Sequence, residues 1–169
     1  MTRIFLRLLP CLAILITAGC STYDRRFAEA SKAPAKAGQF AGTYAGRWMS
    51  ASHPGGGGNL RCILTRLENI PCGHALPGSV AYRADFHATW HGFSSEHTVM
   101  LHTAPAARKK SGSGARDFEG TSKLRTIIGA GTYTCKGTMD NRTMRACYDA
   151  TYDRGTFELQ RAESIQKRR

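Results

Sequence analysis

The stretch "VAYRADFHATW", residues 80–90, alternates apolar and polar side chains along its whole length. In an extended strand successive side chains point to opposite faces, so a period of two gathers one set on a single face. The apolar face carries Val80, Tyr82, Ala84, Phe86, Ala88 and Trp90. The other face carries Arg83, Asp85, His87 and Thr89. The pattern predicts a long strand with one face in a core and the other in water.

The same alternation recurs on both sides of this stretch. It predicts strands near 41–50, 59–67, 79–90, 95–103, 115–123, 129–139, 143–152 and 155–161. The links between them contain the residues that turns favour, as in "HPGGGGN" (53–59), "HGF" (91–93) and "DRG" (153–155). Sequential strands joined in this way indicate an all-β fold, an antiparallel up-and-down barrel of about eight strands over residues 40–161. The alternative is a sandwich, because a single open sheet could not bury these strands.

The N-terminus has the layout of an export signal, with basic residues, then an apolar run, then small residues just before Cys20. The sequence Thr17-Ala18-Gly19-Cys20 resembles the lipobox of bacterial lipoproteins, with Thr17 in place of the usual leucine. This resemblance implies a signal peptide over residues 1–19 and acylation of Cys20 by diacylglyceryl and palmitate-type chains. Two or three chains on one residue anchor a protein firmly to a lipid bilayer.

The segments that flank the barrel are polar. Residues 20–39 are rich in alanine, lysine and serine and show no apolar period, so we expect a lipidated N-terminus followed by a flexible tether. Residues 162–169 form a basic tail. Ser21 follows the cysteine, and the lipoprotein resemblance implies that serine there permits transfer to the outer membrane. We therefore expect a lipid-anchored protein of the cell envelope, on the periplasmic face of the outer membrane rather than in the inner membrane.

The first and last predicted strands carry a second resemblance. "GTYAGRW" (42–48) contains Gly46-x-Trp48, and "GTFELQR" (155–161) ends in Arg161. The chain thus resembles the lipocalins, which open on Gly-x-Trp and carry a late arginine; their middle Thr-Asp-Tyr motif is absent here. The resemblance implies a barrel whose end is closed by Arg161 packed across Trp48, through a cation–π contact.

An eight-stranded barrel can fill its own interior or hold one small ligand. The inward face is expected to present Tyr82, Phe86, Trp90 and Tyr133 as candidate ligand-lining residues. Small residues such as Ala84 and Ala88 lie among them. Large beside small side chains can interdigitate into a dry core, or they can leave an apolar pocket floored by aromatic rings.

Four cysteines fall in the mature domain: Cys62, Cys72, Cys135 and Cys147. An even number in an exported protein predicts two disulfide bonds. Cys62 and Cys135 share faces with apolar neighbours and are expected to point inward, whereas Cys147 is expected to point outward, so a Cys135–Cys147 bridge would need a bulge. The pairings Cys62–Cys72 and Cys62–Cys135 both remain open.

The sequence offers no catalytic motif. "HPGGGGN" does not lead into a phosphate-binding loop, and "GFSSE" (92–96) has Glu96 where a nucleophile elbow requires glycine, so the glycine run is interpreted as a hairpin tip. His87 and His91 are too far apart on one strand to bind the same metal ion. His91 and His97 could meet across a hairpin, but two histidine ligands make a weak metal site. We therefore expect surface histidines, no metal site and no cofactor.

The chain carries 24 basic and 12 acidic side chains, a net charge of +12. Arg108, Lys109, Lys110 and Arg116 cluster around one predicted hairpin. Export makes nucleic acid an unsuitable partner, so the charge points to anionic lipid head groups or other envelope polyanions. Together these features predict a non-catalytic binding or structural module for a small apolar ligand or an envelope partner. The alternative is an envelope-acting hydrolase with a site at the barrel mouth.

Overall fold

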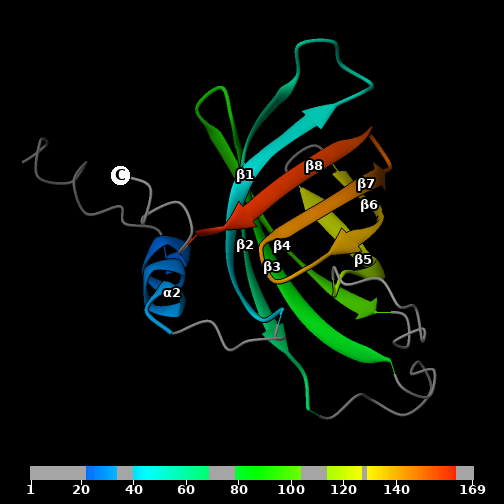
Figure 1. Cartoon of the computed structure of the whole chain (residues 1–169). Coiled ribbons are helices and arrows are strands. Elements are labelled where there is room, and N and C mark those ends of the chain that lie inside the picture. The colour runs from blue at the N-terminus through cyan, green and yellow to red at the C-terminus, as the bar shows by residue number, and fades with distance from the viewer. Residues whose placement is uncertain (1–21, 34–39, 69–78, 104–113, 127–128, 163–169) are drawn as a thin grey trace, which may run out of the picture.

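The computed structural model describes residues 22–33, 40–68, 79–103, 114–126 and 129–162. Eight antiparallel strands pair in chain order and the last pairs with the first, which closes a barrel (Figure 1). The elements are α2 (Thr22–Ser31), β1 (Gly42–Ser50), β2 (Gly57–Arg66), β3 (Val80–Trp90), β4 (Phe93–Thr103), β5 (Arg116–Thr126), β6 (Gly129–Met139), β7 (Thr143–Ala150) and β8 (Asp153–Arg161). The predicted all-β, up-and-down antiparallel barrel of eight strands is confirmed.

The opening stretch, residues 80–90, forms β3 with the predicted alternation. Tyr82, Ala84 and Phe86 are buried in the barrel. A two-residue turn of His91 (φ 43°) and Gly92 (φ 84°) then reverses the chain, and Trp90 pairs with Phe93 across it. Positive φ at both central residues is the requirement of the hairpin turn whose twist matches that of paired strands.

The barrel is packed solid in one half. The side chains that fill this half come from all eight strands and from the segment before β1, and they include Phe40, Tyr44, Cys62, Leu64, Tyr82, Ala84, Phe86, Val99, Leu101, Phe118, Cys135, Met139, Met144, Ala146 and Leu159. Val99, Leu101, Met144 and Leu159 are completely inaccessible to solvent. This half is a dry core in which large and small residues interdigitate.

Arg161 closes the packed end, but not over Trp48 as the lipocalin resemblance implied. Its guanidinium carbon lies 5.1 Å from the ring centroid of Tyr44, its partner in the β1–β8 register. Its nitrogens donate to the carbonyl oxygens of Asn141 (2.7 Å), Ala41 (3.1 Å) and Phe40 (3.2 Å). Trp48 lies four residues further along β1, a distance of ~13 Å along a strand, so its side chain lies toward the opposite end of the barrel.

The prediction of a flexible tether over residues 20–39 is wrong for residues 22–31, because Thr22–Ser31 form α2 against the outside of the barrel (Figure 1); residues 20–21 and 34–39 lie outside the described residues. Tyr23 is fully buried there; its ring stacks on His87 at 4.8 Å between centroids and its hydroxyl donates to the Asp85 carbonyl. Salt bridges join Arg26 to Asp85 (2.9 Å) and Asp24 to Arg61 (2.5 Å). The short helix is stable because the barrel wall covers its apolar side.

This helix also changes the environment of the outer face of β3. His87 was expected at the surface, yet it is buried beneath α2, and so is Asp85. The Asp85 carboxylate is satisfied by Arg26, Arg83 and the hydroxyl of Thr98. Burial is also the main reason that the pKa of His87 lies below its ordinary value.

The two predicted disulfide bonds are not formed among the described cysteines, because Cys62, Cys135 and Cys147 are free. The expected directions are confirmed: Cys62 and Cys135 are buried in the barrel and Cys147 is exposed. In the β6–β7 register Cys135 faces Tyr148 while Cys147 faces Lys136, so the two thiols lie on opposite sides of the barrel wall. Cys72 lies outside the described residues.

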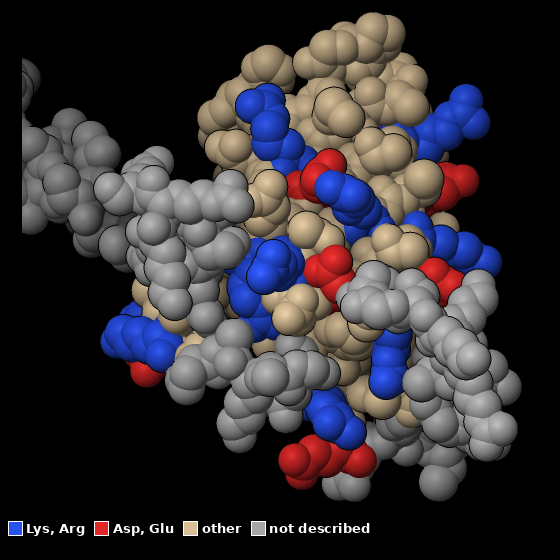
Figure 2. Space-filling model, viewed as in Figure 1, with Lys and Arg blue, Asp and Glu red and all other residues tan. Residues whose placement is uncertain are grey.

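Acidic and basic side chains are interspersed over the outer wall seen in Figure 2, and the end formed by the β1–β2 hairpin carries few of them. Arg108, Lys109, Lys110 and the tail beyond residue 162 lie outside the described residues. Arg116 of that predicted cluster packs its guanidinium carbon 5.8 Å from the ring centroid of Phe40. None of the helices in the described ranges is long and apolar enough to cross a bilayer.

Candidate functional site

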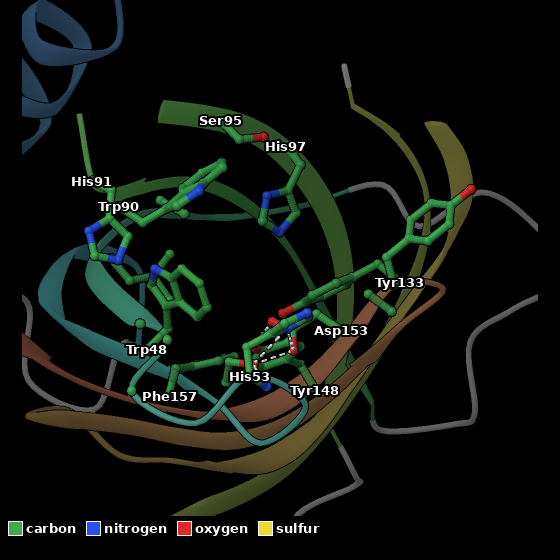
Figure 3. Close-up of a pocket in the computed structure, with 18 of the residues that line it drawn as sticks. Trp48, His53, Trp90, His91, Ser95, His97, Tyr133, Tyr148, Asp153 and Phe157 are labelled. Atoms are coloured by element: carbon green, nitrogen blue, oxygen red, sulfur yellow. Dashed lines mark hydrogen bonds and ion pairs between the residues drawn. The ribbon is translucent and has the colours of Figure 1, made fainter. Parts of the chain in front are cut away.

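The half of the barrel opposite Arg161 is hollow. A cavity of about 620 Å³ opens between the β1–β2, β3–β4 and β7–β8 hairpins (Figure 3). Its lining is Trp48, Ser50, His53, Pro54, Gly55, Gly56, Gly57, Leu60, Ala88, Trp90, His91, Ser95, His97, Tyr133, Tyr148, Ala150, Tyr152, Asp153 and Phe157. The barrel interior therefore combines the two predicted alternatives, with a packed core at the closed end and an aromatic-lined pocket at the open end.

Aromatic rings at steep angles to one another form the cavity walls. The ring of Trp48 stands at 82° to Trp90 and at 74° to Tyr148, with centroids 6.2 and 6.4 Å apart. Tyr133 stacks on Tyr148 at 6.0 Å. Both the edge-to-face pairs of Trp48 and the stacked tyrosine pair are favourable arrangements, and they limit the orientations of the rings. The cavity is open because the inward residues at Ala88 and Ala150 are small.

His97, a residue of the lining, packs between two aromatic rings. Its ring stacks on Phe86 at 5.3 Å and meets Tyr133 edge-on at 4.9 Å. Burial lowers its pKa to about 4, so the imidazole is neutral at pH 7. Its Nε2 and the indole Nε1 of Trp48 are both buried without a hydrogen-bond partner in the described structure.

A hydrogen-bonded polar group forms one side of the mouth. The Asp153 carboxylate accepts from the Ser50 hydroxyl (2.6 Å) and from the Tyr148 hydroxyl (2.7 Å). Burial and this contact raise the pKa of Tyr148. The Nδ1 of His53 lies 3.4 Å from Ser50 Oγ and 3.8 Å from Asp153 Oδ1. Across the described ranges, no three His, Cys, Asp or Glu side chains lie close enough to hold a metal ion.

The glycine run, which was interpreted as a hairpin tip, also forms part of the rim of the cavity. Gly55, Gly56 and Gly57 all line the mouth, and the Ser50 N–H and the Gly56 carbonyl close the hairpin at 3.1 Å. Gly55 (φ 79°) adopts a left-handed conformation that other residues rarely tolerate. A rim without side chains leaves the entrance to the cavity wide.

Two of the four candidate ligand-lining residues, Trp90 and Tyr133, line the cavity. The other two do not: Tyr82 lies in the packed half beside Phe40, and Phe86 packs against Phe157 below the cavity. Trp48, which was expected to close the barrel, lines the cavity instead.

Sequence reasoning missed the polar part of the mouth: Ser50, His53, Tyr148 and Asp153. A signal was available for three of them. Ser50 lies two residues beyond Trp48, and Tyr148 lies two residues beyond the buried Ala146, so the period of two extends to both. Asp153 likewise lies four residues before the buried Phe157. His53 belongs to the hairpin, where no period applies.

No family model, no curated protein and no solved structure matches this chain. The class of protein is therefore defined by the fold and the cavity alone. It is a closed eight-stranded antiparallel barrel with a packed end, an aromatic-lined cavity at the open end and a helix on its outer wall.

Proposed function

We propose that this protein is a non-catalytic binding module of the cell envelope that holds a small apolar ligand inside its barrel. The observation that carries the proposal is the cavity of about 620 Å³ walled by Trp48, Trp90, Tyr133, Tyr148 and Phe157. Ligand pockets in proteins enclose roughly 300–1,000 Å³ and combine apolar walls with a few polar groups.

The difference between the packed half and the hollow half of the barrel supports a role in ligand binding. The packed half supplies most of the buried core, and the rings of the open half border that core on one side and the cavity on the other. A ligand that covers these rings would gain about 25 cal/mol for each Å² of apolar surface removed from water. It would enter a preformed site, which lowers the entropic cost of binding.

Cys20 supplies the anchor in this proposal. Acylation there would hold the protein in the bilayer, on the periplasmic face of the outer membrane, with the mature chain at a net charge of +10 after loss of Arg3 and Arg7. Cys20→Ser should release the protein from the membrane fraction and leave the precursor uncut. Unchanged fractionation with normal maturation would exclude the lipid anchor and leave the binding proposal untouched.

The mouth residues favour binding over hydrolysis, although Ser50, His53 and Asp153 lie together. In a catalytic triad the serine donates to a histidine that the carboxylate orients. Here the Ser50 hydroxyl donates to Asp153 itself at 2.6 Å, and His53 is largely exposed, with 70% of its side chain in solvent. The serine proton therefore points to the carboxylate and not to the His53 ring, whose Nδ1 lies 3.4 Å from Ser50 Oγ.

The test uses the mature domain and N-phenyl-1-naphthylamine, an uncharged apolar fluorophore. We expect one-to-one binding with quenching of tryptophan emission, because Trp48 and Trp90 line the cavity. Ala88→Phe places a ring in the cavity and should weaken binding at least tenfold. The matched control is Thr156→Phe, which adds the same ring at an exposed position on the outside of β8.

Far-UV circular dichroism and a thermal melt establish that both variants are folded. If Ala88→Phe does not fold, Ala150→Phe fills the cavity from β7. The absence of binding to the unsubstituted protein, or equal binding by the filled and control variants, would contradict the proposal.

A further inference from the structure

We infer that the ligand of the cavity is an amphiphile with a cationic head, a quaternary ammonium or a protonated amine, that sits at the mouth beside Asp153. The inference rests on the proposed function, since it assigns a chemical class to the ligand of that same cavity. It is carried by the charge of the lining, by the way Asp153 is held and by the arrangement of the rings.

The charge of the lining has the opposite sign to that of the protein. The chain has 24 lysine and arginine residues, yet none lines the described cavity, whereas Asp153 does. Arg154, the next residue along β8, is exposed on the outer face and pairs in register with Asp149 of β7. A head group at the mouth therefore meets a carboxylate without an adjacent lysine or arginine in the lining.

Asp153 is fixed and only partly hydrated. Its two oxygens each accept one hydroxyl proton, from Ser50 and from Tyr148, and 25% of its side chain is exposed. Neutral donors of this kind hold a carboxylate in place and leave its charge uncompensated. Screening at physiological salt acts over ~8 Å, so this local charge outweighs the net positive charge of more distant residues for a group that reaches the mouth.

The aromatic rings of the cavity wall, of which Tyr148 contacts Asp153, provide the second attraction for a cation. Tyr148, which donates to Asp153, stands at 74° to Trp48, and Trp48 stands at 82° to Trp90. Perpendicular rings present faces in different directions around one space, as in the aromatic sites that bind quaternary ammonium groups. Each ring face attracts a cation through its quadrupole, and indole does so most strongly.

An anionic head group has no comparable partner in the lining. His97 is neutral, because burial lowers its pKa to about 4. Among the residues that the structure describes, His53 is placed to offset the carboxylate, with its Nδ1 3.8 Å from Asp153 Oδ1, but it is mostly in solvent. A carboxylate in the mouth would face Asp153 and the negative faces of the rings, so both contacts oppose it.

The test compares three ligands of equal chain length: dodecyltrimethylammonium and dodecanoate below their micelle concentrations, and dodecanol below its solubility limit. Tryptophan fluorescence and titration calorimetry measure their affinities for the mature domain at pH 7. We expect the trimethylammonium compound to bind roughly ten- to thirtyfold more tightly than dodecanol, and dodecanoate to bind more weakly than both.

Two variants separate the local charge from the overall charge. Asp153→Asn should lower the affinity for dodecyltrimethylammonium about five- to tenfold and leave that for dodecanol unchanged. Asp149→Asn removes the same charge from an exposed position on β7 and should change neither affinity. A thermal melt of each variant establishes that the barrel is intact.

The outcomes distinguish this inference from the proposed function. Binding of all three ligands with equal affinity, or tightest binding of dodecanoate, overturns the cationic assignment and leaves an apolar binding module. An equal loss of trimethylammonium affinity in Asp149→Asn and Asp153→Asn also overturns it. Failure of all three ligands and of the uncharged fluorophore to bind overturns the proposed function itself.

Discussion

Arg161, the last residue of β8, lies with its guanidinium over the ring of Tyr44 on β1, 5.1 Å from the centroid, and its Nη2 donates to the Tyr44 hydroxyl at 3.1 Å. The two residues are opposite each other in the pairing that closes the barrel. The same hydroxyl donates to the Phe40 carbonyl at 2.6 Å. The start and the end of the barrel are therefore joined by side chains as well as by backbone hydrogen bonds.

Loss of the Arg161 side chain should weaken the whole fold. Arg161→Met keeps the apolar stem but leaves the carbonyl oxygens of Phe40, Ala41 and Asn141 without this donor. Since unsatisfied buried acceptors cost about 1–3 kcal/mol each and part of the site can admit water, we expect the free energy of unfolding to fall by about 2–4 kcal/mol in urea titrations. Arg154→Met, an exposed arginine of the same strand, is the control. Equal stability of the two variants would show that Arg161 is not needed for closure.

The docking of α2 should depend on Tyr23. The ring is fully buried between His87 and the Arg61 guanidinium, whose carbon lies 5.3 Å from its centroid. Tyr23→Ala should release the helix, so that trypsin cleaves after Arg25 and Arg26 much faster than in the unsubstituted protein while the barrel stays folded. Tyr152→Ala alters a tyrosine that is 51% exposed and should leave the cleavage rate unchanged. Equal cleavage of the Tyr23→Ala and unsubstituted proteins would contradict the docking.

The three described cysteines should differ sharply in reactivity. Burial raises the pKa of the Cys62 thiol well above its ordinary value and that of Cys135 to about 12, whereas Cys147 is exposed. In a mature domain that carries Cys72→Ser, a thiol reagent at pH 8 should label one cysteine rapidly in the native state and three after denaturation without reductant. A denatured, unreduced protein with a single reactive thiol would restore a disulfide between Cys62 and Cys135.

The stability of the barrel should fall on acidification through His97. Its pKa in the fold is about 4, below the ordinary value of 6.5, so the unfolded chain takes up the proton first. The stabilising contribution is complete above pH 6.5 and is lost as the pH falls toward 4. Between pH 7 and pH 5 we expect the free energy of unfolding to fall by about 2 kcal/mol because of His97. In the His97→Phe variant this part of the decrease should be absent. An identical profile for the variant would exclude His97 as the source.

The eight strands could be predicted because one face of each is buried, which imposes a period of two that the sequence displays directly. Nothing periodic distinguishes the packed half from the hollow half. Phe86 and Trp90 lie on one face of one strand, yet Phe86 packs against Phe157 and Trp90 lines the cavity. That difference depends on which residues the neighbouring strands bring opposite, for example Ser95 opposite Ala88.

The helix was missed because its signal is brief. Tyr23, Phe27 and Ala30 recur at the i, i+4 and i+7 positions of a helical face, but ten residues give that period fewer than three turns to appear. A helix this short is marginal alone and forms because the barrel wall buries Tyr23. Likewise the position of Arg161 over Tyr44, rather than Trp48, follows from the register between β1 and β8, which a motif at each end of the chain does not specify.

The place where α2 begins sets the distance between the barrel and any membrane that holds it. One residue separates Cys20 from Thr22, so the backbone between an acylated cysteine and the helix can extend only ~7 Å. Because α2 lies against the barrel wall, an acyl group on Cys20 would be attached close to the folded domain and not at the end of a long flexible linker. Under the proposed anchoring, the barrel would lie close to the lipid head groups, and a ligand would pass between the lipid surface and the cavity over a short distance.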